Sequence, residues 1–304
     1  MDRLASNLDQ DVSDAEKPVM VFGEGDDHLV STSATHAAIP QELFNLNELD
    51  CFYEDRRQTL WTYMRPAGRP SFTPTMLTDF VDWQRLIGDN FGPGKVPLRF
   101  LVLGSRSPGV FCFGGDLELF QRFIREQNRP GLVQYGYRCV EILHRNMHAL
   151  DVPMLTVGLV EGAALGGGFE ALLSFDYIVA ERGATFGLPE VMFGLFPGMG
   201  AHAILSRKLG TALADRLIVS NETYTAEQMY EGLDACRELI DRSERRHAGL
   251  VNARKASRCA APISLSELKR ITELWADAAL QLREQDLKVM SRLASAQSRL
   301  VKAA

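Results

Sequence analysis

The chain has 304 residues, 46% of them hydrophobic, and carries a formal net charge of −6 at pH 7. This size permits one large domain or two ordinary ones around a full core. The acidic balance argues against nucleic acid as the main partner, because neutralisation of phosphates supplies most non-specific affinity. No run approaches the roughly 18 apolar residues of a membrane span, and the first twenty residues are too polar for a signal peptide, so we expect a cytoplasmic protein without a membrane span.

The first elements follow an N-terminal segment of little regular pattern. Residues 1–45 mix acidic, Ser/Thr and Gly positions, which predicts a variable, flexible extension. Leu60, Trp61 and Tyr63 then indicate a strand, and Thr73 with Pro74 predicts the start of a helix over 75–89. Residues 97–105 read as a buried strand, and the loop 106–116 ends at Asp116, which can cap a helix over 117–128.

The middle of the chain repeats one pattern of elements. A helix is expected over 130–150, a buried strand over 153–162, a turn at Gly166 to Gly168, a short helix over 169–175 and a strand over 176–181. After the turn at 195–200 the pattern becomes helical. Thr225 to Gln228 and Ser264 to Glu267 both have capping-box spacing. The second opens a helix with one apolar face, formed by Leu268, Ile271, Trp275, Ala278 and Leu282.

Metal and disulfide sites are not expected. The five cysteines are odd in number, scattered and never in a C-x-x-C pair, so we interpret them as core thiols: Cys51, Cys112, Cys139, Cys236 and Cys259. His144 and His148 stand four residues apart on one helix, but no third ligand accompanies them, which favours a packing role.

Two carboxylates stand in apolar, glycine-rich surroundings. Glu170 follows three consecutive glycines, and Glu190 lies twenty residues later within Leu-Pro-Glu. A helix that starts at Gly167 or Gly168 leaves its first amides without partners, and the loop before Asp116 could add a second amide from Phe113 or Gly114. Two such amides can hold a carbonyl oxyanion while the acids move protons at the next carbons. Addition or removal of water is the chemistry that this set favours.

A dinucleotide site is the main alternative. Gly166, Gly168 and Ala171 fit the G-x-G-x-x-G/A pattern after a strand. Only seven residues separate Gly168 from Asp176, however, which is too short for the crossover helix of such a fold. Glu170 would also place a negative charge where pyrophosphate binds.

Three motifs carry a resemblance to a known family. "ALGGGFE", "FGLPEV" and the upstream "FCFGGDLELF" closely resemble the crotonase (enoyl-CoA hydratase/isomerase) superfamily, from about residue 50 to the C-terminus. Within it, "LPEVMFGLFPGMGA", "YTAEQ", "RITELWADAALQL" and "RLASAQSR" look like the diffusible signal factor synthases, bacterial enzymes that make cis-2-unsaturated fatty acid messengers.

The resemblance implies a fold and a set of site residues. The fold would be an α/β spiral of ββα repeats over 46–231 with a C-terminal helical region over 232–304, assembled as trimers or pairs of trimers. By this resemblance Glu170 and Glu190 match the family's two catalytic glutamates, and Phe113 and Gly167 match the positions whose amides bind the thioester oxygen. Further residues expected to contact the substrate are Gly114, Gly115, Gly166, Gly168, Pro197, Gly198, Met199 and Trp275. Met199 and Trp275 have even odds of being walls for an acyl chain or plain core residues.

The resemblance also implies a reaction and partners. A 3-hydroxyacyl group on acyl carrier protein would be dehydrated to the cis-2-enoyl form and then hydrolysed to the free acid, with no cofactor beyond the carrier of the thioester, whether acyl carrier protein or CoA. The alternatives are an enoyl-CoA hydratase or isomerase without thioester cleavage, and an idle binding protein, which retention of both glutamates disfavours. Arg122, Arg125 and Arg129 could receive an acidic carrier, although such a run is usually a solvated helix face. A regulatory sensor kinase is implied by the resemblance alone.

Two further points concern single positions. Glu161 lies before the glycine turn, at a strand end, and is expected to face solvent or a neighbouring strand. After "YTAEQMYE" the family continues with a glycine and a Leu-Val-Asp-x-Val strand, whereas here Glu231 runs directly into "GLDACRELIDRSERR". Either this member has a shortened connection, or a loop is missing between Glu231 and Gly232. We favour the missing loop, because the flanks otherwise match in register, and an intact peptide across that bond would refute the omission.

Overall fold

A computed structural model describes residues 38–220, 222–226 and 247–303 of the chain. Most of the expected N-terminal extension, the Gln228 end of the first capping box, Cys236 and the junction of Glu231 with Gly232 lie outside these residues. Within the described part, no helix is both long and apolar enough to cross a membrane.

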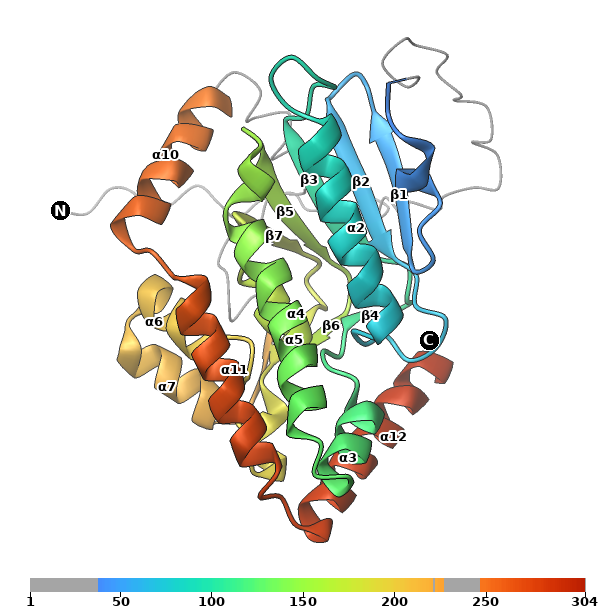
Figure 1. Cartoon of the computed structure of the whole chain (residues 1–304), viewed down its shortest axis with the longest axis vertical. Coiled ribbons are helices and arrows are strands. Elements are labelled where there is room, and N and C mark those ends of the chain that lie inside the picture. Colours follow the sequence, from blue (N-terminus) through green and yellow to red (C-terminus); the bar gives the residue numbers. More distant parts are fainter. Residues whose placement is uncertain (1–37, 221, 227–246, 304) are drawn as a thin grey trace, which may run out of the picture.

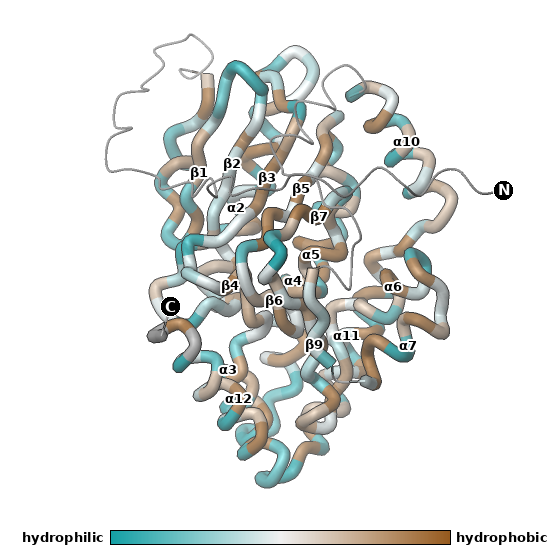
Figure 2. The backbone as a smooth tube through the Cα atoms, turned by 180° about the vertical axis from the view of Figure 1, so that it is seen from behind, coloured by the Kyte–Doolittle hydropathy of each residue, from teal (hydrophilic) through white to brown (hydrophobic). Residues whose placement is uncertain are grey.

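Five strands form the larger of two sheets. They are β1 (Leu49–Glu54), β2 (Thr59–Met64), β3 (Phe100–Ser105), β5 (Leu155–Val160) and β7 (Tyr177–Ala180), in the order β1-β2-β3-β5-β7. β1 is antiparallel to β2, and the other neighbours are parallel. β2 and β3 are buried along almost their whole length, as is typical of a sheet covered on both faces. Figure 2 shows β3, β5 and β7 mostly in the brown of hydrophobic residues.

Four shorter strands form the second sheet. They are β4 (Val110–Cys112), β6 (Ala163–Leu165), β8 (Thr185–Gly187) and β9 (Thr223–Thr225), in the order β4-β6-β8-β9, with β9 antiparallel to β8. β3 leads into β4, β5 into β6 and β7 into β8, so each pass of the chain adds one strand to each sheet before a helix follows. This arrangement confirms the expected spiral of ββα repeats.

Helices connect these passes of the chain. The first are α2 (Pro74–Asn90), α3 (Leu117–Arg125), α4 (Arg129–Met147) and α5 (Gly167–Leu172). α2 and α4 lie side by side over one face of the sheet (Figure 1). The Thr73 hydroxyl accepts from the Met76 amide and the Asp116 carboxylate accepts from the Glu118 and Leu119 amides, so both expected N-caps are confirmed.

The C-terminal part is helical, as expected. It contains α6 (Ala201–Leu209), α7 (Thr211–Val219), α10 (His247–Ala260), α11 (Leu265–Ala279) and α12 (Glu284–Ala303). The Ser264 hydroxyl caps α11 through the Glu267 amide, as its spacing predicted. α11 packs along α4, and α12 packs against α3 at the end of the molecule farthest from the larger sheet (Figure 1).

Two expectations about burial need correction. The short helix Gln41–Phe44 brings Leu43 into the core beside Ile39, so ordered packing begins before residue 45. Cys112 and Cys139 are buried as expected, whereas Cys259 is exposed on α10 because its side of that helix faces away from the core.

Candidate active site

The two glutamates come from neighbouring turns of the spiral. β6 ends at Leu165 and leads through Gly166 into α5, which carries Glu170; β8 ends at Gly187 and leads into the short helix Pro189–Phe193, which carries Glu190. Leu165 is paired with Gly187 in parallel strands, so both chains leave the sheet at the same edge. The twenty-residue spacing is therefore one turn of the spiral.

Both carboxylates face one pocket of about 640 Å³, its mouth included. A Cβ placed on Gly166 would lie 2.7 Å from Glu190 Oε1, which shows how closely that carboxylate approaches the backbone in front of α5. The structure thus brings together the pair of acids that the sequence singled out.

Glu170 is held firmly inside the protein. Its side chain is 1% exposed, and Oε1 accepts hydrogen bonds from the amides of Met199 (2.9 Å) and Ala201 (3.0 Å) at the start of α6. Burial raises the pKa of Glu170 to about 7, and the two amides oppose that rise because they stabilise the carboxylate. The carboxyl group is therefore fixed in place, and its pKa lies well above that of an exposed glutamate.

Glu190 has fewer partners. Its Oε2 is buried and makes no hydrogen bond to any described residue. Burial, followed by the negative charge of Glu170, raises the pKa of Glu190 to about 8. Because the two acids interact and the pKa of each is raised, they titrate as a pair, and such a pair can offer one base and one acid at once.

The oxyanion hole differs from the expected one. The Phe113 amide donates to the Pro70 carbonyl at 2.7 Å, and the Gly114 amide lies 3.3 Å from Cys112 Sγ. In this structure the Phe113 amide is thus engaged with Pro70 and is not available to a ligand, although Phe113 itself lines the pocket. The amides of Gly115 and Gly167 have no hydrogen-bond partner among the described residues, and both residues line the pocket.

The two free amides are brought together by glycine contacts. A Cβ on Gly167 would lie 3.4 Å from the Gly115 amide nitrogen, and a Cβ on Gly114 would lie 2.4 Å from the Gly167 nitrogen. Gly114 also has φ +86°, which side chains other than glycine rarely adopt. Gly168 is needed for the same approach, since its Cβ would lie 2.2 Å from the Cys112 carbonyl oxygen.

Tyr135 is a pocket residue that the sequence did not reveal. From α4, its buried hydroxyl donates to the Phe72 carbonyl and accepts from the Asp116 amide at 3.2 Å. It therefore ties the loop that carries Gly115 to the chain segment before α2. The sequence signal was weak, because a tyrosine on the apolar face of a helix usually indicates core packing.

The other expected substrate contacts divide into two groups. Gly115, Gly166, Gly198, Met199 and Trp275 line the pocket. Gly114 and Gly168 do not line the pocket and instead allow the close packing described above. Pro197 lines a separate surface groove. Residues that the sequence did not suggest complete the wall: Leu117, Phe120, Gly136, Pro189, Phe193, Thr272, Leu293 and Gln297.

The remaining candidates lie away from the carboxylates. Arg125 and Arg129 of the basic run pair with Glu284 and Asp277, which join α3 and α4 to the C-terminal helices. His144 and His148 lie with their rings 4.5 Å apart, and within the described ranges no three potential ligands gather as a metal site. Glu161 is exposed, as expected for the end of its strand.

Comparisons with known proteins agree with this geometry. Residues 65–233 match the enoyl-CoA hydratase/isomerase family. Probable enoyl-CoA hydratase 2 of Arabidopsis thaliana is 34% identical over 128 residues, and human methylglutaconyl-CoA hydratase is 30% identical over 157 residues. The matches cover 42% and 47% of this chain but only 40% and 44% of those relatives.

The fold is shared with solved structures of the same kind. Enoyl-CoA hydratase from Bacillus halodurans superimposes with a TM-score of 0.65 at 19% identity, over 81% of this chain and 100% of that structure. Since the family match covers more than half of the chain, and the spiral and the paired glutamates accompany it, the protein belongs to the enoyl-CoA hydratase/isomerase family, the crotonase superfamily.

Proposed function

We propose that the protein dehydrates a 3-hydroxyacyl thioester and then hydrolyses the product to a free cis-2-enoic acid, the activity of a signal synthase. The observation that carries the proposal is the pair of carboxylates Glu170 and Glu190 in one pocket with the amides of Gly115 and Gly167, which have no hydrogen-bond partner among the described residues. The resemblance of residues 188–201, 224–228, 270–282 and 292–299 to the signal factor synthases supports the narrower choice of product.

Dehydration uses the two carboxyl groups in opposite states. The ionised member of the pair removes a proton from C2, and the resulting enolate oxygen is held by the Gly115 and Gly167 amides. The protonated member gives its proton to the departing 3-hydroxyl, so that water leaves and the C2–C3 double bond forms. Afterwards the pair still holds one proton.

Thioester hydrolysis can follow with the enoyl product still bound and with no exchange of protons with solvent. The carboxylate that gave its proton to the hydroxyl accepts one from a water molecule, whose oxygen forms a bond to the carbonyl carbon. The same two amides stabilise the tetrahedral oxyanion. At this point both carboxyl groups are protonated; when the C–S bond breaks, the one that took the C2 proton gives it to the departing thiol, which restores the starting state.

Several features of the proposal remain predictions. They are acyl carrier protein as the carrier, a homotrimer or hexamer, a sensor kinase as a regulatory partner, and a cytoplasmic location. The reaction as written needs no cofactor other than the carrier.

A hydratase or isomerase that leaves the thioester intact is the second candidate. It is favoured by the relatives, whose names describe hydratases of acyl-CoA thioesters. The same carboxylates and amides would serve it, because only the last hydrolytic step is absent.

Mass spectrometry of the products separates the two. Purified protein is incubated with 3-hydroxydodecanoyl thioesters of acyl carrier protein and of CoA, beside a Glu170→Gln, Glu190→Gln double variant. Free cis-2-dodecenoic acid from the unaltered protein alone is the expected result. An enoyl product that stays on its carrier would overturn the hydrolysis and leave the hydratase, and no product from either carrier would overturn both.

A further inference from the structure

Two buried side-chain amides in the described part of the chain carry an oxygen without a hydrogen-bond partner. They belong to Asn146 and Gln297, which are 4% and 2% exposed. In folded proteins the large majority of buried polar atoms are paired, so an unpaired oxygen of this kind indicates a partner from outside the chain. The surroundings of the two amides differ.

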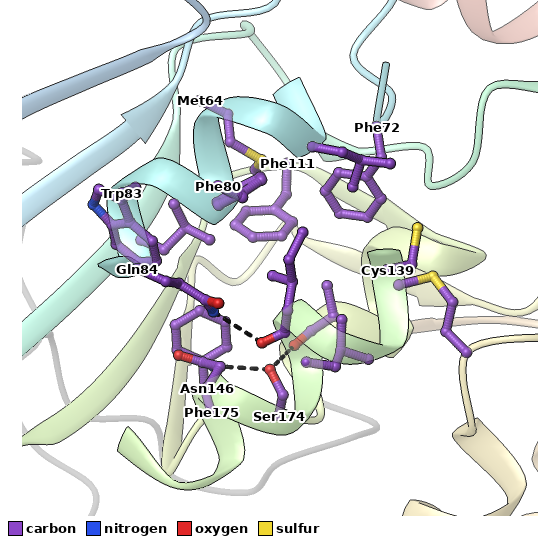
Figure 3. Close-up of a pocket in the computed structure, with 16 residues that line it drawn as sticks. Met64, Phe72, Phe80, Trp83, Gln84, Phe111, Cys139, Asn146, Ser174 and Phe175 are labelled. Atoms are coloured by element: carbon purple, nitrogen blue, oxygen red, sulfur yellow. Dashed lines mark hydrogen bonds between the residues drawn. The ribbon is translucent and has the colours of Figure 1, made fainter. Parts of the chain in front are cut away.

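Asn146 lies beside a small cavity between α2, α4 and α5. Figure 3 shows it with Gln84, which donates to the Ile142 carbonyl, and with Ser174, whose Oγ accepts from Asn146. The cavity has a volume of about 30 Å³, and its wall is otherwise mostly apolar. It has room for about one water molecule, which would pair the Asn146 oxygen and needs no further function.

Gln297 instead faces the catalytic pocket. It lies on α12, four residues after Leu293, and both side chains line the pocket that holds Glu170 and Glu190. α12 packs against the short helix Pro189–Phe193, which carries Glu190. Because residues four apart share one face of a helix, this face of α12 closes the pocket next to the helix of Glu190.

Two contacts fix the height of Gln297 along α3. Arg125 pairs with Glu284, and Ser291 donates to Gln121, so α12 runs antiparallel to α3. The same register, followed toward the C-terminus of α12, brings Gln297 level with the start of α3. The loop that offers one of the two oxyanion amides ends at that point. Gln297 therefore lies between this loop and the helix that carries the second glutamate.

The polar atoms of the pocket ask for two kinds of ligand atom. The amides of Gly115 and Gly167 are donors and suit a carbonyl oxygen. Gln297 Oε1 is an acceptor and needs a group that carries a hydrogen, and Glu190 Oε2 is unpaired in the same pocket. One hydroxyl group can satisfy both, because it accepts from a protonated carboxyl group and donates to an amide oxygen. A hydrocarbon there would leave the amide oxygen unpaired, which is unfavourable in a buried site.

We propose that Gln297 binds the 3-hydroxyl group of the substrate and makes the site selective for 3-hydroxyacyl over saturated acyl thioesters. The hydroxyl oxygen accepts from the protonated carboxyl group, and its hydrogen is donated to Gln297 Oε1. The inference rests on the proposed function for the position of the thioester at the Gly115 and Gly167 amides. It holds equally without thioester hydrolysis, because the 3-hydroxyl group is present in both candidate reactions. A substrate that lacks this hydroxyl leaves the amide oxygen unpaired and is rejected for that reason.

Isothermal titration calorimetry tests the selectivity. The Glu170→Gln, Glu190→Gln background prevents turnover, and the probes are 3-hydroxydodecanoyl and dodecanoyl thioesters of CoA and of acyl carrier protein. The 3-hydroxy thioester should bind at least about ten-fold more tightly than the saturated one, as expected for one hydrogen bond to an otherwise unpaired buried oxygen. Gln297→Met, which replaces the amide by an apolar group of similar length, should lower the ratio of the two dissociation constants by about ten-fold.

Gln121→Met is the matched control. Gln121 is also buried where α3 meets α12, but its oxygen accepts from Ser291 and it is not among the residues that line the pocket. This variant should lower the melting temperature and leave the binding ratio unchanged. Gln297→Met without ligand should melt no lower than the unaltered protein, because it removes an oxygen that has no partner. A lower melting temperature with an unchanged ratio would show a structural role for Gln297 and overturn the proposal.

The remaining outcomes separate the inference from the proposed function. An unchanged ratio in Gln297→Met, while the unaltered protein forms the free enoic acid, would overturn the inference and leave the proposed function standing. A lowered ratio together with an enoyl product that stays on its carrier would support the hydroxyl contact and overturn only the hydrolysis. Binding of neither thioester on either carrier would overturn both.

Discussion

Glu190 makes the stability of this protein depend on pH in an unusual direction. Burial and the charge of Glu170 raise its pKa from 4.5 to about 8. Between pH 4.5 and about pH 8, Glu190 is protonated in the folded protein and ionised in the unfolded chain. A carboxyl group of this kind stabilises the fold fully below the unfolded pKa, and the contribution is lost as pH rises through the folded pKa. Stability should therefore fall from acidic toward mildly basic pH.

The size of the effect follows from the linkage relation. One proton corresponds to about 1.4 kcal/mol per pH unit, so the free energy of unfolding should drop by on the order of 3 kcal/mol between pH 5.5 and pH 7.5 through Glu190. Glu170, with its pKa raised to about 7, adds to the slope over much of that range. Glu190→Gln removes the Glu190 share, because an amide does not ionise.

Urea denaturation at several pH values measures this slope. Oε2 of Glu190 has no hydrogen-bond partner among the described residues, so the amide of Glu190→Gln adds a cost that does not depend on pH. The quantity to compare is therefore the slope of the unfolding free energy against pH and not its absolute value. Glu126→Gln, at an exposed position after α3, is the control and should run parallel to the unaltered protein. Parallel profiles for Glu190→Gln as well would refute the argument that Glu190 is buried with a raised pKa.

Three more substitutions, one of them with a matched control, test the packing around the site, the anchor of the Gly115 loop and the cap of α11. Gly168→Ala should lower the free energy of unfolding by about 1–3 kcal/mol or more, since its Cβ would meet the Cys112 carbonyl. Gly183→Ala is the control: the space around Gly183 is open, so its free energy of unfolding should stay within about 0.5 kcal/mol of the unaltered protein, and thermal melts would compare the two. Tyr135→Phe should lower kcat roughly 10- to 100-fold with little change in KM, because the loop that carries Gly115 loses its anchor, and it should also cost about 1–3 kcal/mol of stability, because the Phe72 carbonyl loses its donor; steady-state kinetics and thermal melts would measure the two effects. Ser264→Ala should cost about 1 kcal/mol through the lost cap of α11, which a urea titration would detect, and an unchanged midpoint would contradict the capping role.

Much of the fold could be predicted because its signals are local. Thr73, Asp116 and Ser264 each act on an amide two or three residues away, so their capping roles can be read from spacing. The buried strands carry apolar runs long enough to recognise. β4, β6 and β8 have only three residues each, too few for any periodicity, so the second sheet was not foreseen as a sheet.

The site divides in the same way. The glutamates could be found because a motif fixes them within one turn of the spiral. Whether Phe113 or Gly115 offers its amide to a ligand depends on Pro70, more than 40 residues earlier in the chain. The Pro70 carbonyl accepts from the Phe113 amide and leaves the Gly115 amide free. Tyr135 likewise acts through Phe72 and Asp116, which only the folded chain brings to it. Long-range contacts of this kind leave no pattern in a single sequence.

The place of α12 in the pocket wall has a consequence for synthesis of the chain. Leu293 and Gln297 close the catalytic pocket, although Glu190 is made about 100 residues earlier. At roughly 5–20 residues per second, a ribosome would hold the spiral core with an open apolar cleft for about 5–20 s. During that interval the nascent chain exposes the surface that chaperones bind and that aggregates share. α12 thus completes the cleft long after both glutamates have been made, and a chain truncated before α12 would carry Glu170 and Glu190 in a site without this part of its wall.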